Sequence, residues 1–264
     1  MDGRDEPGHD ANLQVGPMTS PFASRIALVT GASRGIGYAA AKALGQSGAH
    51  VIAVARTQGG LEELDDEIRK AGGHAATLVP LDLTDFEAIA RLGAAIYERH
   101  GKLDVMVACA GIAGPSSPLG HIELKKWTDV AALDVTANFQ LIRCMEPLLR
   151  ASDAGRAVFM TSRSGGKAPA YRGPYAAAKA ALETMVRVWA KELVNITQVR
   201  ANLFDPGPTR TKLRATFMPG EDPETLPTPD EVVQQLLPLC LPSCTDTGRL
   251  FDHPPGTLTD LSSD

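Results

Sequence analysis

The feature that most constrains the fold is a series of short, nearly continuous apolar runs that alternate with stretches of helical periodicity. Apolar runs of this kind are typical of strands buried on both faces of a parallel sheet. Strand–helix alternation at this spacing predicts right-handed βαβ units, and therefore an α/β fold with a doubly wound parallel sheet. The expected strands are 25–30, 50–55, 75–81, 103–108, 156–162, 198–204 and a seventh, 248–252, that closes the sheet.

The segments between these strands predict helices. The third expected helix begins with Thr84 followed three residues later by Glu87, which is the pattern of a capping box. No internal repeat or linker interrupts the series, so we expect a single domain over residues 24–264. Residues 1–23 are polar, rich in Gly and Pro and without apolar periodicity, which predicts a flexible tail. The expected helices are 36–47, 60–71, 85–100, 122–150, 174–194 and 228–239.

The composition excludes several classes of protein. The 264 residues are 44% apolar and 22% charged, with a net charge of −5 and no basic run, which argues against a nucleic-acid partner. No stretch approaches the ~20 apolar residues of a membrane span, and the N-terminus lacks a secretory signal pattern, so we expect a cytoplasmic protein. The four cysteines have no companions at metal-ligand spacing, and we therefore expect reduced thiols and no metal site.

In a doubly wound sheet, ligands bind at the carboxyl ends of the strands. The first strand is followed by TGASRGIG at 30–37, which opens the first helix. Glycines there let the backbone approach a pyrophosphate, whose charge the helix N-terminus favours. A Gly-rich turn without a ligand is the alternative, but the placement favours a dinucleotide-binding turn. Its expected contacts are Gly31, Ser33, Arg34, Gly35, Ile36 and Gly37.

The end of the second strand bears on which dinucleotide is bound. Ala55 stands where NAD-binding proteins usually carry an acidic residue for the ribose 2′-hydroxyl, and Arg56 follows it. Together with Arg34, this second guanidinium would flank a 2′-phosphate, unless both arginines are only solvated surface charges. The pattern favours NADP(H) over NAD(H).

Two further strand ends carry candidate contacts. Asp82 and Leu83 follow the third strand, where they either contact an adenine or, for Asp82, help to start the next helix. After the fourth strand, the small-residue turn 108–114 would let the backbone of Ala110 and Gly111 lie close to a ligand.

The fifth strand ends at Ser162, and Tyr175 and Lys179 follow at the start of a helix. At i and i+4 the two side chains share one helix face, as in a surface pair or in an acid–base pair. The glycine turn, Ser162, Tyr-x-x-x-Lys and DPGPTRT at 205–211 together resemble the short-chain dehydrogenase/reductase family. The resemblance covers about residues 24–252, with the motifs in order and at matching spacings.

This resemblance implies a Rossmann-like domain and an oxidoreductase that interconverts a carbonyl and an alcohol by hydride transfer. Tyr175 would be the general acid/base, Ser162 would bind the substrate oxygen, and Lys179 would assist the phenol and reach the nicotinamide ribose. Residues 210–228 would form a substrate lid, and helices 122–150 and 174–194 a homodimer or homotetramer contact. The expected contacts of the nicotinamide are Pro206, Gly207, Thr209 and Thr211.

The chain departs from the family pattern at two places near the expected site. Ala108 and Cys109 replace a typical Asn-Asn pair, and Asp134 occupies the position of a typical asparagine, 28 residues before Ser162. We interpret Asp134 as a support for the charge of Lys179; alternatively, only its backbone carbonyl matters. These departures leave open a second function, a cofactor-binding protein of the same fold with weak or lost catalysis that acts as a sensor or interaction partner.

The substrate and the physiological direction are not readable from the sequence. Basic residues in the segments that flank the expected pocket would either attract an anionic substrate or lie solvated in loops. They are Arg163, Lys167, Arg172, Arg210, Lys212 and Arg214.

Overall fold

The computed structural model describes residues 20–254 and 256–260. Their strands form one sheet in the order β3-β2-β1-β4-β5-β6-β7-β8. Neighbours from β3 to β7 pair in parallel, and β8 pairs with β7 in the antiparallel sense. The predicted doubly wound parallel sheet is therefore confirmed, with one unpredicted edge strand. The strands are β1 Ile26–Thr30, β2 His50–Ala55, β3 Thr77–Pro80, β4 Val105–Ala108, β5 Arg156–Met160, β6 Arg200–Asp205, β7 Arg249–Asp252 and β8 Thr257–Asp260.

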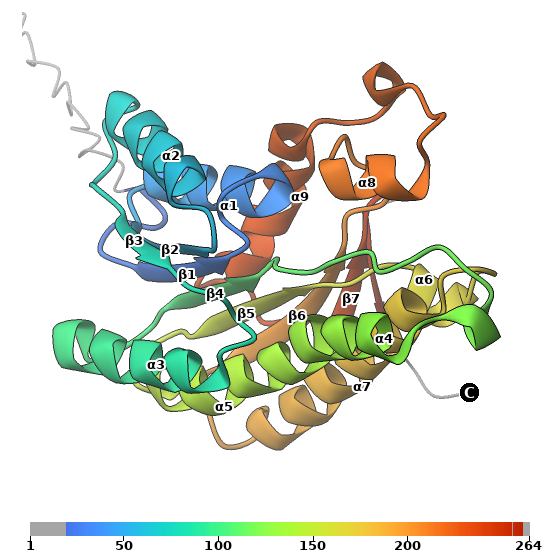
Figure 1. Ribbon diagram of the computed structural model, residues 1–264. Coiled ribbons are helices and arrows are strands. Elements are labelled where there is room, and N and C mark those ends of the chain that lie inside the picture. The colour runs from blue at the N-terminus through green and yellow to red at the C-terminus, as the bar shows by residue number, and fades with distance from the viewer. Residues whose placement is uncertain (1–19, 255, 261–264) are drawn as a thin grey trace, which may run out of the picture.

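Helices cover both faces of this sheet. In Figure 1, α1, α2 and α9 lie on one side of it, and α3, α5 and α7 lie on the other. Among the described residues, no helix is long and apolar enough to cross a membrane. The helices are α1 Gly35–Gln46, α2 Gln58–Lys70, α3 Phe86–His100, α4 Leu124–Val130, α5 Ala137–Arg150, α6 Ser164–Lys167, α7 Gly173–Leu193, α8 Lys212–Phe217 and α9 Pro229–Cys240, with short 3₁₀ turns at Leu119–His121 and Pro223–Thr225.

Strands β1 to β7 are mainly apolar because they contribute side chains to two separate cores. In β5, Ala157 and Phe159 face the core under α3, α5 and α7, whereas Val158 and Met160 face the core under α1, α2 and α9. Successive strand residues point to opposite faces of a sheet, so two buried faces leave few positions for a polar side chain. The buried Asn202 inside β6 is one, and its amide donates to the Asp246 carbonyl and accepts from the Arg249 amide.

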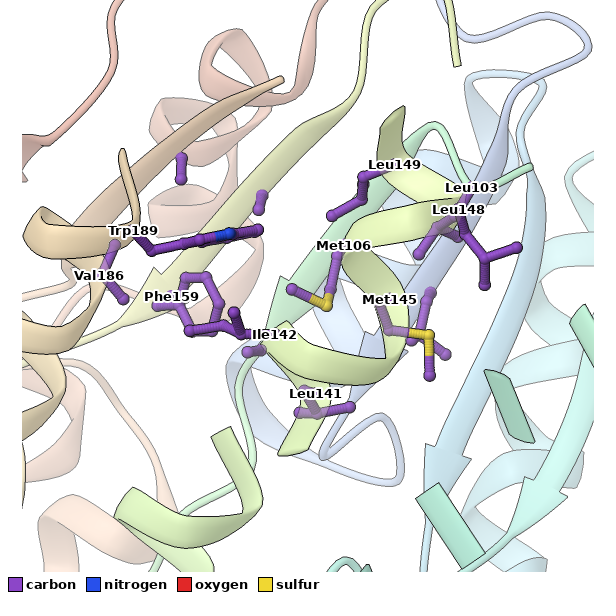
Figure 2. Packing of buried hydrophobic residues seen from close by; sticks show 14 of the residues in the cluster. Leu103, Met106, Leu141, Ile142, Met145, Leu148, Leu149, Phe159, Val186 and Trp189 are labelled. Atoms are coloured by element: carbon purple, nitrogen blue, oxygen red, sulfur yellow. The ribbon is translucent and has the colours of Figure 1, made fainter. Parts of the chain in front are cut away.

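Aromatic and sulfur-containing side chains fill the core under α5 and α7. Phe159 meets Trp189 edge to face, with ring centroids 6.1 Å apart, and Figure 2 shows Val186 beside them. The Trp189 indole N–H donates to the Glu146 carboxylate at 2.7 Å, so the one polar atom of that ring is satisfied. Met106 and Met145 lie in the same cluster, where their flexible side chains fill the space between β4 and α5.

The start of the folded region differs from the prediction. Phe22 is only 1% exposed and lies in the core under α1, and the Ser20 hydroxyl donates to the Ser47 carbonyl. Residues 20–23 thus belong to the folded region, although the sequence assigned them to the tail. The rest of that predicted tail, residues 1–19, lies outside the described residues.

The capping box predicted at Thr84 and Glu87 is wrong. Asp85 caps α3, because its carboxylate accepts a hydrogen bond from the Ala88 amide at 3.0 Å. The Thr84 hydroxyl lies outside the helix and donates to Asp82 at 2.8 Å. A capping box does occur at α9, between Thr228 and Glu231.

The helix predicted over 122–150 is not a uniform α-helix. It begins at Leu124, and one wide π-helical turn, Ala131–Thr136, separates α4 from α5. The Asn138 amide donates to the Asp134 carbonyl at 2.9 Å, which satisfies an acceptor inside this turn. Wide turns of this type frequently accompany functional sites, and Asp134 is the fully buried residue of this one.

The Phe159→Ala variant tests the core. Because Phe159 is fully buried, its truncation leaves a cavity, and we expect the free energy of unfolding to fall by about 3–5 kcal/mol. The matched control is Tyr97→Ala in α3, where the ring is 66% exposed and the expected change is about 0.5 kcal/mol or less. Urea denaturation measures both, and similar losses in the two variants would contradict the assigned core.

Candidate active site

The turn between β1 and α1 has the geometry of an anion cradle. Gly31 and Gly35 have φ values of +69° and +60°, in the left-handed region that favours glycine. A Cβ atom on Gly37 would overlap the carbonyl oxygen of Gly31, so this position also requires glycine. No acidic residue lies in the first turn of α1, whose free N–H groups therefore face the turn without a competing negative charge.

The loops after β1 and β4 lie against each other. A Cβ on Gly31 would come within 3.0 Å of the Ala110 amide nitrogen, and the Thr30 hydroxyl accepts from the Cys109 and Ala110 amides at 3.2 and 3.3 Å. The fully buried Thr30 thus joins the two strand ends where the family pattern has an asparagine brace. Ser33 is part of the same turn and packs closely on Gly60 at the start of α2.

Arg34 and Arg56 are exposed beside this turn. Neither makes a hydrogen bond or a salt bridge in the part of the chain that the structure describes. The charge of Arg56 contributes to a lowered pKa of Asp82, after the larger effect of the Thr84 amide, so Arg56 lies near the end of β3. Both guanidinium groups are available for an anionic ligand.

The structure gives Asp82 a role in the turn that precedes α3. Its carboxylate accepts from the Thr84 amide at 2.9 Å and from the Thr84 hydroxyl. Leu83 turns inward, and its side chain belongs to the core under α3. A ligand at this strand end would therefore meet the backbone of Leu83, not its side chain.

Asp205 at the end of β6 organises the segment that follows it. Its carboxylate accepts from the Gly207 amide at 2.9 Å and from the Arg163 amide at 2.6 Å, which ties this segment to the residue after Ser162. Gly207 has φ +63°, and a Cβ there would overlap the His253 carbonyl oxygen. Sequence reasoning gave Asp205 no role, although its place at the carboxyl end of a strand was a usable signal.

The two threonines of this segment lead from the strand end to α8. The Thr209 hydroxyl donates to the Pro206 carbonyl at 3.1 Å, and Thr211 caps α8 by accepting from the Arg214 amide at 3.1 Å. The Thr211 methyl group would lie 3.5 Å from a Cβ on Gly35. The structure thus brings the glycine turn and the 206–211 segment together.

Tyr175 and Lys179 lie on one face of α7, and neither reaches water as a surface pair would. Their exposed fractions are 6% and 4%. The Lys179 ammonium lies 5.4 Å from the centroid of the Tyr175 ring, donates to the Met160 carbonyl at 3.1 Å, and lies 3.6 Å from the Asp134 carboxylate. Pro174 occupies the first turn of α7, where its missing N–H removes no helical hydrogen bond.

Opposing effects set the protonation of this pair. Burial raises the pKa of Tyr175, and the charges of Asp134 and Asp205 add to this, while Lys179 and the Ser162 hydroxyl lower it; the net direction is upward. Burial has the largest single effect on the Lys179 pKa and lowers it. The charges of Asp134 and Tyr175 and the contact with the Asp134 carboxylate together outweigh burial, and the net direction of the Lys179 pKa is upward. The ammonium is therefore retained, and the phenol is protonated at neutral pH.

Ser162 lies two residues beyond the end of β5. Its hydroxyl accepts from the Ser164 amide at 3.2 Å and lies 3.2 Å from the Ser164 hydroxyl. The short helix α6 starts at Ser164, so this local pairing fixes Ser162 at the junction of strand and helix.

Asp134 is fully buried and reaches Lys179 from the wide turn of the neighbouring helix. One carboxylate oxygen accepts from the Ile112 amide at 3.0 Å, and the other accepts no hydrogen bond from the described residues. A Cβ on Gly111 would come within 3.1 Å of that second oxygen, so Gly111 leaves room for the carboxylate.

An aromatic contact that sequence reasoning missed joins α8 to the site. The Phe217 ring meets the Tyr175 ring at a centroid distance of 4.9 Å and an angle of 61°. The Arg172 guanidinium lies 4.0 Å from the centroid of the Phe217 ring and donates to the Phe217 carbonyl at 3.1 Å. Residues 210–228 therefore contact the Tyr175 ring directly, a long-range pairing that no local sequence pattern signals.

The structure divides the six basic residues of the flanking segments into two groups. Three form ion pairs, Arg163 with Asp252, Arg210 with Glu224 and Arg214 with Glu221. The other three, Lys167, Arg172 and Lys212, have no carboxylate partner within the described ranges.

Comparison with known proteins agrees with this arrangement. The model of the short chain dehydrogenase family matches residues 25–222. The oxidoreductase YciK of Escherichia coli is 37% identical over 241 residues, which cover 90% of this chain and 95% of that protein. The cis-4-hydroxycyclohexanecarboxylate dehydrogenase of Sinomonas cyclohexanicum is 33% identical, with 83% and 90% coverage. A solved short-chain dehydrogenase from Shigella flexneri, complexed with NADP, has a TM-score of 0.85 and 36% identity, covering 90% of this chain and 100% of that one.

The Arg172→Ala variant tests the contact between α7 and α8. It removes a stacked guanidinium and a hydrogen bond to Phe217, so we expect the amides of residues 212–218 to exchange hydrogen roughly fivefold faster or more. The control is Lys167→Ala, which removes a nearby charge without such a contact. Unchanged exchange in Arg172→Ala, measured by mass spectrometry, would contradict the assigned contact.

Proposed function

Because this chain belongs to the short-chain dehydrogenase/reductase family of oxidoreductases, we propose that it interconverts a ketone or aldehyde and an alcohol by hydride transfer with NADP(H). Tyr175 is the general acid/base of the proposed reaction. The observation that carries the proposal is the buried Tyr175–Lys179 pair on one face of α7, beside the ends of strands that also hold the glycine turn and Ser162.

The residues present fit a dinucleotide. Gly31 and Gly37 leave the backbone cradle free of side chains, and the first turn of α1 offers N–H groups to a pyrophosphate. The proposed nicotinamide contacts lie on the 206–211 segment, which Asp205 holds next to Ser162. The bound nicotinamide ring would supply or accept the hydride.

The proton is the part of the reaction that this chain's own residues handle. During reduction, the Tyr175 phenol donates a proton to the substrate oxygen, which the Ser162 hydroxyl holds in place. The Lys179 ammonium then stabilises the phenolate that remains, because an opposite charge nearby favours the ionised form. Oxidation of the alcohol needs the reverse, a phenolate that accepts the proton.

We propose NADP(H) as the cofactor because of the charges near the glycine turn and the end of β2. Arg34 and Arg56 are exposed and make no hydrogen bond or salt bridge with the described residues, and Ala55 leaves the end of β2 without a carboxylate. Guanidinium groups bind phosphates through charge-assisted hydrogen bonds. The complex of the Shigella flexneri relative with NADP supports the same choice.

The proposed substrate pocket lies under residues 210–228, with Phe217 as its aromatic wall. A substrate screen would follow NADPH absorbance over ketones, aldehydes and alcohols. It should include cyclohexanols that bear a carboxylate, because one relative is named for such a compound. We also propose a homo-oligomer through α5 and α7, which expose the apolar side chains Phe139 and Val188.

The Tyr175→Phe variant separates an enzyme from a cofactor-binding protein without catalysis. Removal of one hydroxyl takes away the proton donor and leaves the packing of the ring on Phe217, so we expect kcat to fall by about a hundredfold or more. NADPH affinity, followed by fluorescence titration, should stay within about twofold. If the wild type binds NADPH but turns over nothing in the screen, the second function is supported.

The Arg34→Ala and Arg56→Ala variants test the cofactor preference. Each removes a charge expected to meet the 2′-phosphate, so the Kd for NADPH should rise by about tenfold or more. NADH lacks that phosphate and serves as the internal control, with an expected change of less than about twofold. Equal weakening of both dinucleotides would show that the arginines do not distinguish them.

A further inference from the structure

The Asp134–Lys179 pair places a carboxylate next to the group that would stabilise the Tyr175 phenolate. The Asp134 side chain is fully buried, and its second oxygen lies 3.6 Å from the Lys179 nitrogen without a hydrogen bond from any described residue. A buried charge is costly unless an opposite charge compensates it. Among the described residues, Lys179 supplies the positive charge that compensates the Asp134 carboxylate.

The other acidic groups around Lys179 are either neutral or accept hydrogen bonds from other residues. Burial raises the pKa of the Cys109 thiol to about 12, so Cys109 is neutral at physiological pH. Glu183, one turn further along α7, accepts from the Thr161 hydroxyl at 2.5 Å. Asp205 on β6 accepts two backbone amides. Among these acidic groups, Asp134 is the one whose contact is with the Lys179 nitrogen.

The backbone carbonyl of Asp134 does not account for this contact. That oxygen accepts from the Asn138 amide at 2.9 Å. The Lys179 ammonium instead donates to the Met160 carbonyl and faces the Asp134 side chain. The charge at position 134 therefore acts on Lys179 directly.

We propose that Asp134 is a positioning residue that neutralises Lys179 and thereby keeps the Tyr175 phenol protonated, the form that reduces a carbonyl, at neutral and mildly alkaline pH. This inference rests on the proposed function, because the Tyr175 proton has a chemical role only in the proposed reaction. Burial raises the pKa of Asp134, and the charge of Lys179 opposes this. When Asp134 and Lys179 hold one proton between them, the pair carries no net charge, so Tyr175 meets less positive charge than a lone lysine would supply.

The direction of the effect follows from the charges. Asp134 raises the pKa of Tyr175, and the charge of a neighbouring group commonly moves a pKa by about one unit or more. Without the Asp134 charge, Lys179 would favour the phenolate more strongly and the pKa of Tyr175 would fall. Reduction needs the phenol and fails above this pKa, whereas oxidation needs the phenolate and begins near it.

The test is the pH dependence of kcat in both directions for the wild type and Asp134→Asn. We expect the falling limb of reduction and the rising limb of oxidation to move together to lower pH, by about one unit. Asp134→Ser, which is neutral and smaller, should shift them in the same direction and serves if the asparagine variant does not fold. The matched control is Glu183→Gln, which removes a nearby carboxylate that contacts Thr161 and should shift neither limb comparably.

A second readout does not depend on turnover. The ultraviolet absorbance of tyrosinate, taken as the difference between each protein and its Tyr175→Phe counterpart, reports the ionisation of Tyr175 alone. We expect the phenolate to appear at lower pH in Asp134→Asn than in the wild type. If the wild type turns over nothing but this shift is present, the proposed reaction fails while the electrostatic role of Asp134 stands.

Three results would overturn the inference. The first is an unmoved titration and unmoved limbs in Asp134→Asn. The second is a shift to higher pH, because Lys179 would then have lost its proton and Asp134 would serve only to keep it charged. The third is an equal shift in Glu183→Gln, which would show that any nearby carboxylate has this effect and that the contact between Asp134 and Lys179 is not its cause.

Discussion

Burial of the sheet on both faces is the constraint on which the rest of this molecule depends. Because α1, α2 and α9 cover one face and α3, α5 and α7 the other, most of the strand interior is apolar. The ionisable side chains of these strands lie at the strand ends, and the buried Asn202 inside β6 has both of its amide groups hydrogen-bonded. The chemistry of the protein concentrates at the carboxyl ends of β1, β4, β5 and β6, where Thr30 and Asp205 bind backbone amides of the adjoining loops.

The electrostatics of the site depend on the same exclusion of water. Tyr175, Lys179 and Asp134 are all nearly inaccessible, so their charges are weakly screened and each strongly affects the protonation of the others. Burial by itself would favour neutral forms of all three groups. Only their mutual arrangement, with Lys179 between the phenol and the carboxylate, retains a charged pair in the interior.

The sequence predicted those parts of the site that obey local rules. The glycine turn was predictable because Gly31 and Gly35 require positive φ, and Tyr175 and Lys179 because a spacing of four sets one helix face. Phe217 and Arg172 were not, because their contact joins segments 45 residues apart and depends on how α8 folds back over α7. The cap of α3 was misassigned because Thr84 and Asp85 are adjacent and both are good caps, so the local sequence does not distinguish a helix that starts one residue earlier from one that starts one residue later.

The wide turn at Ala131–Thr136 has a consequence for how this chain tolerates change in length. A π-helical turn contains one residue more than an α-helical turn, so it behaves as a single-residue insertion in a helix that otherwise runs from α4 into α5. Deleting one residue there would allow a regular α-helix to form, and the buried face of α5 would keep its direction because the wide turn holds its extra residue within a single turn. The side chains inside the turn would change direction instead, and the carboxylate beside Lys179 is one of them. Such a deletion would therefore preserve the core packing of α5 and disturb the charge balance of the site.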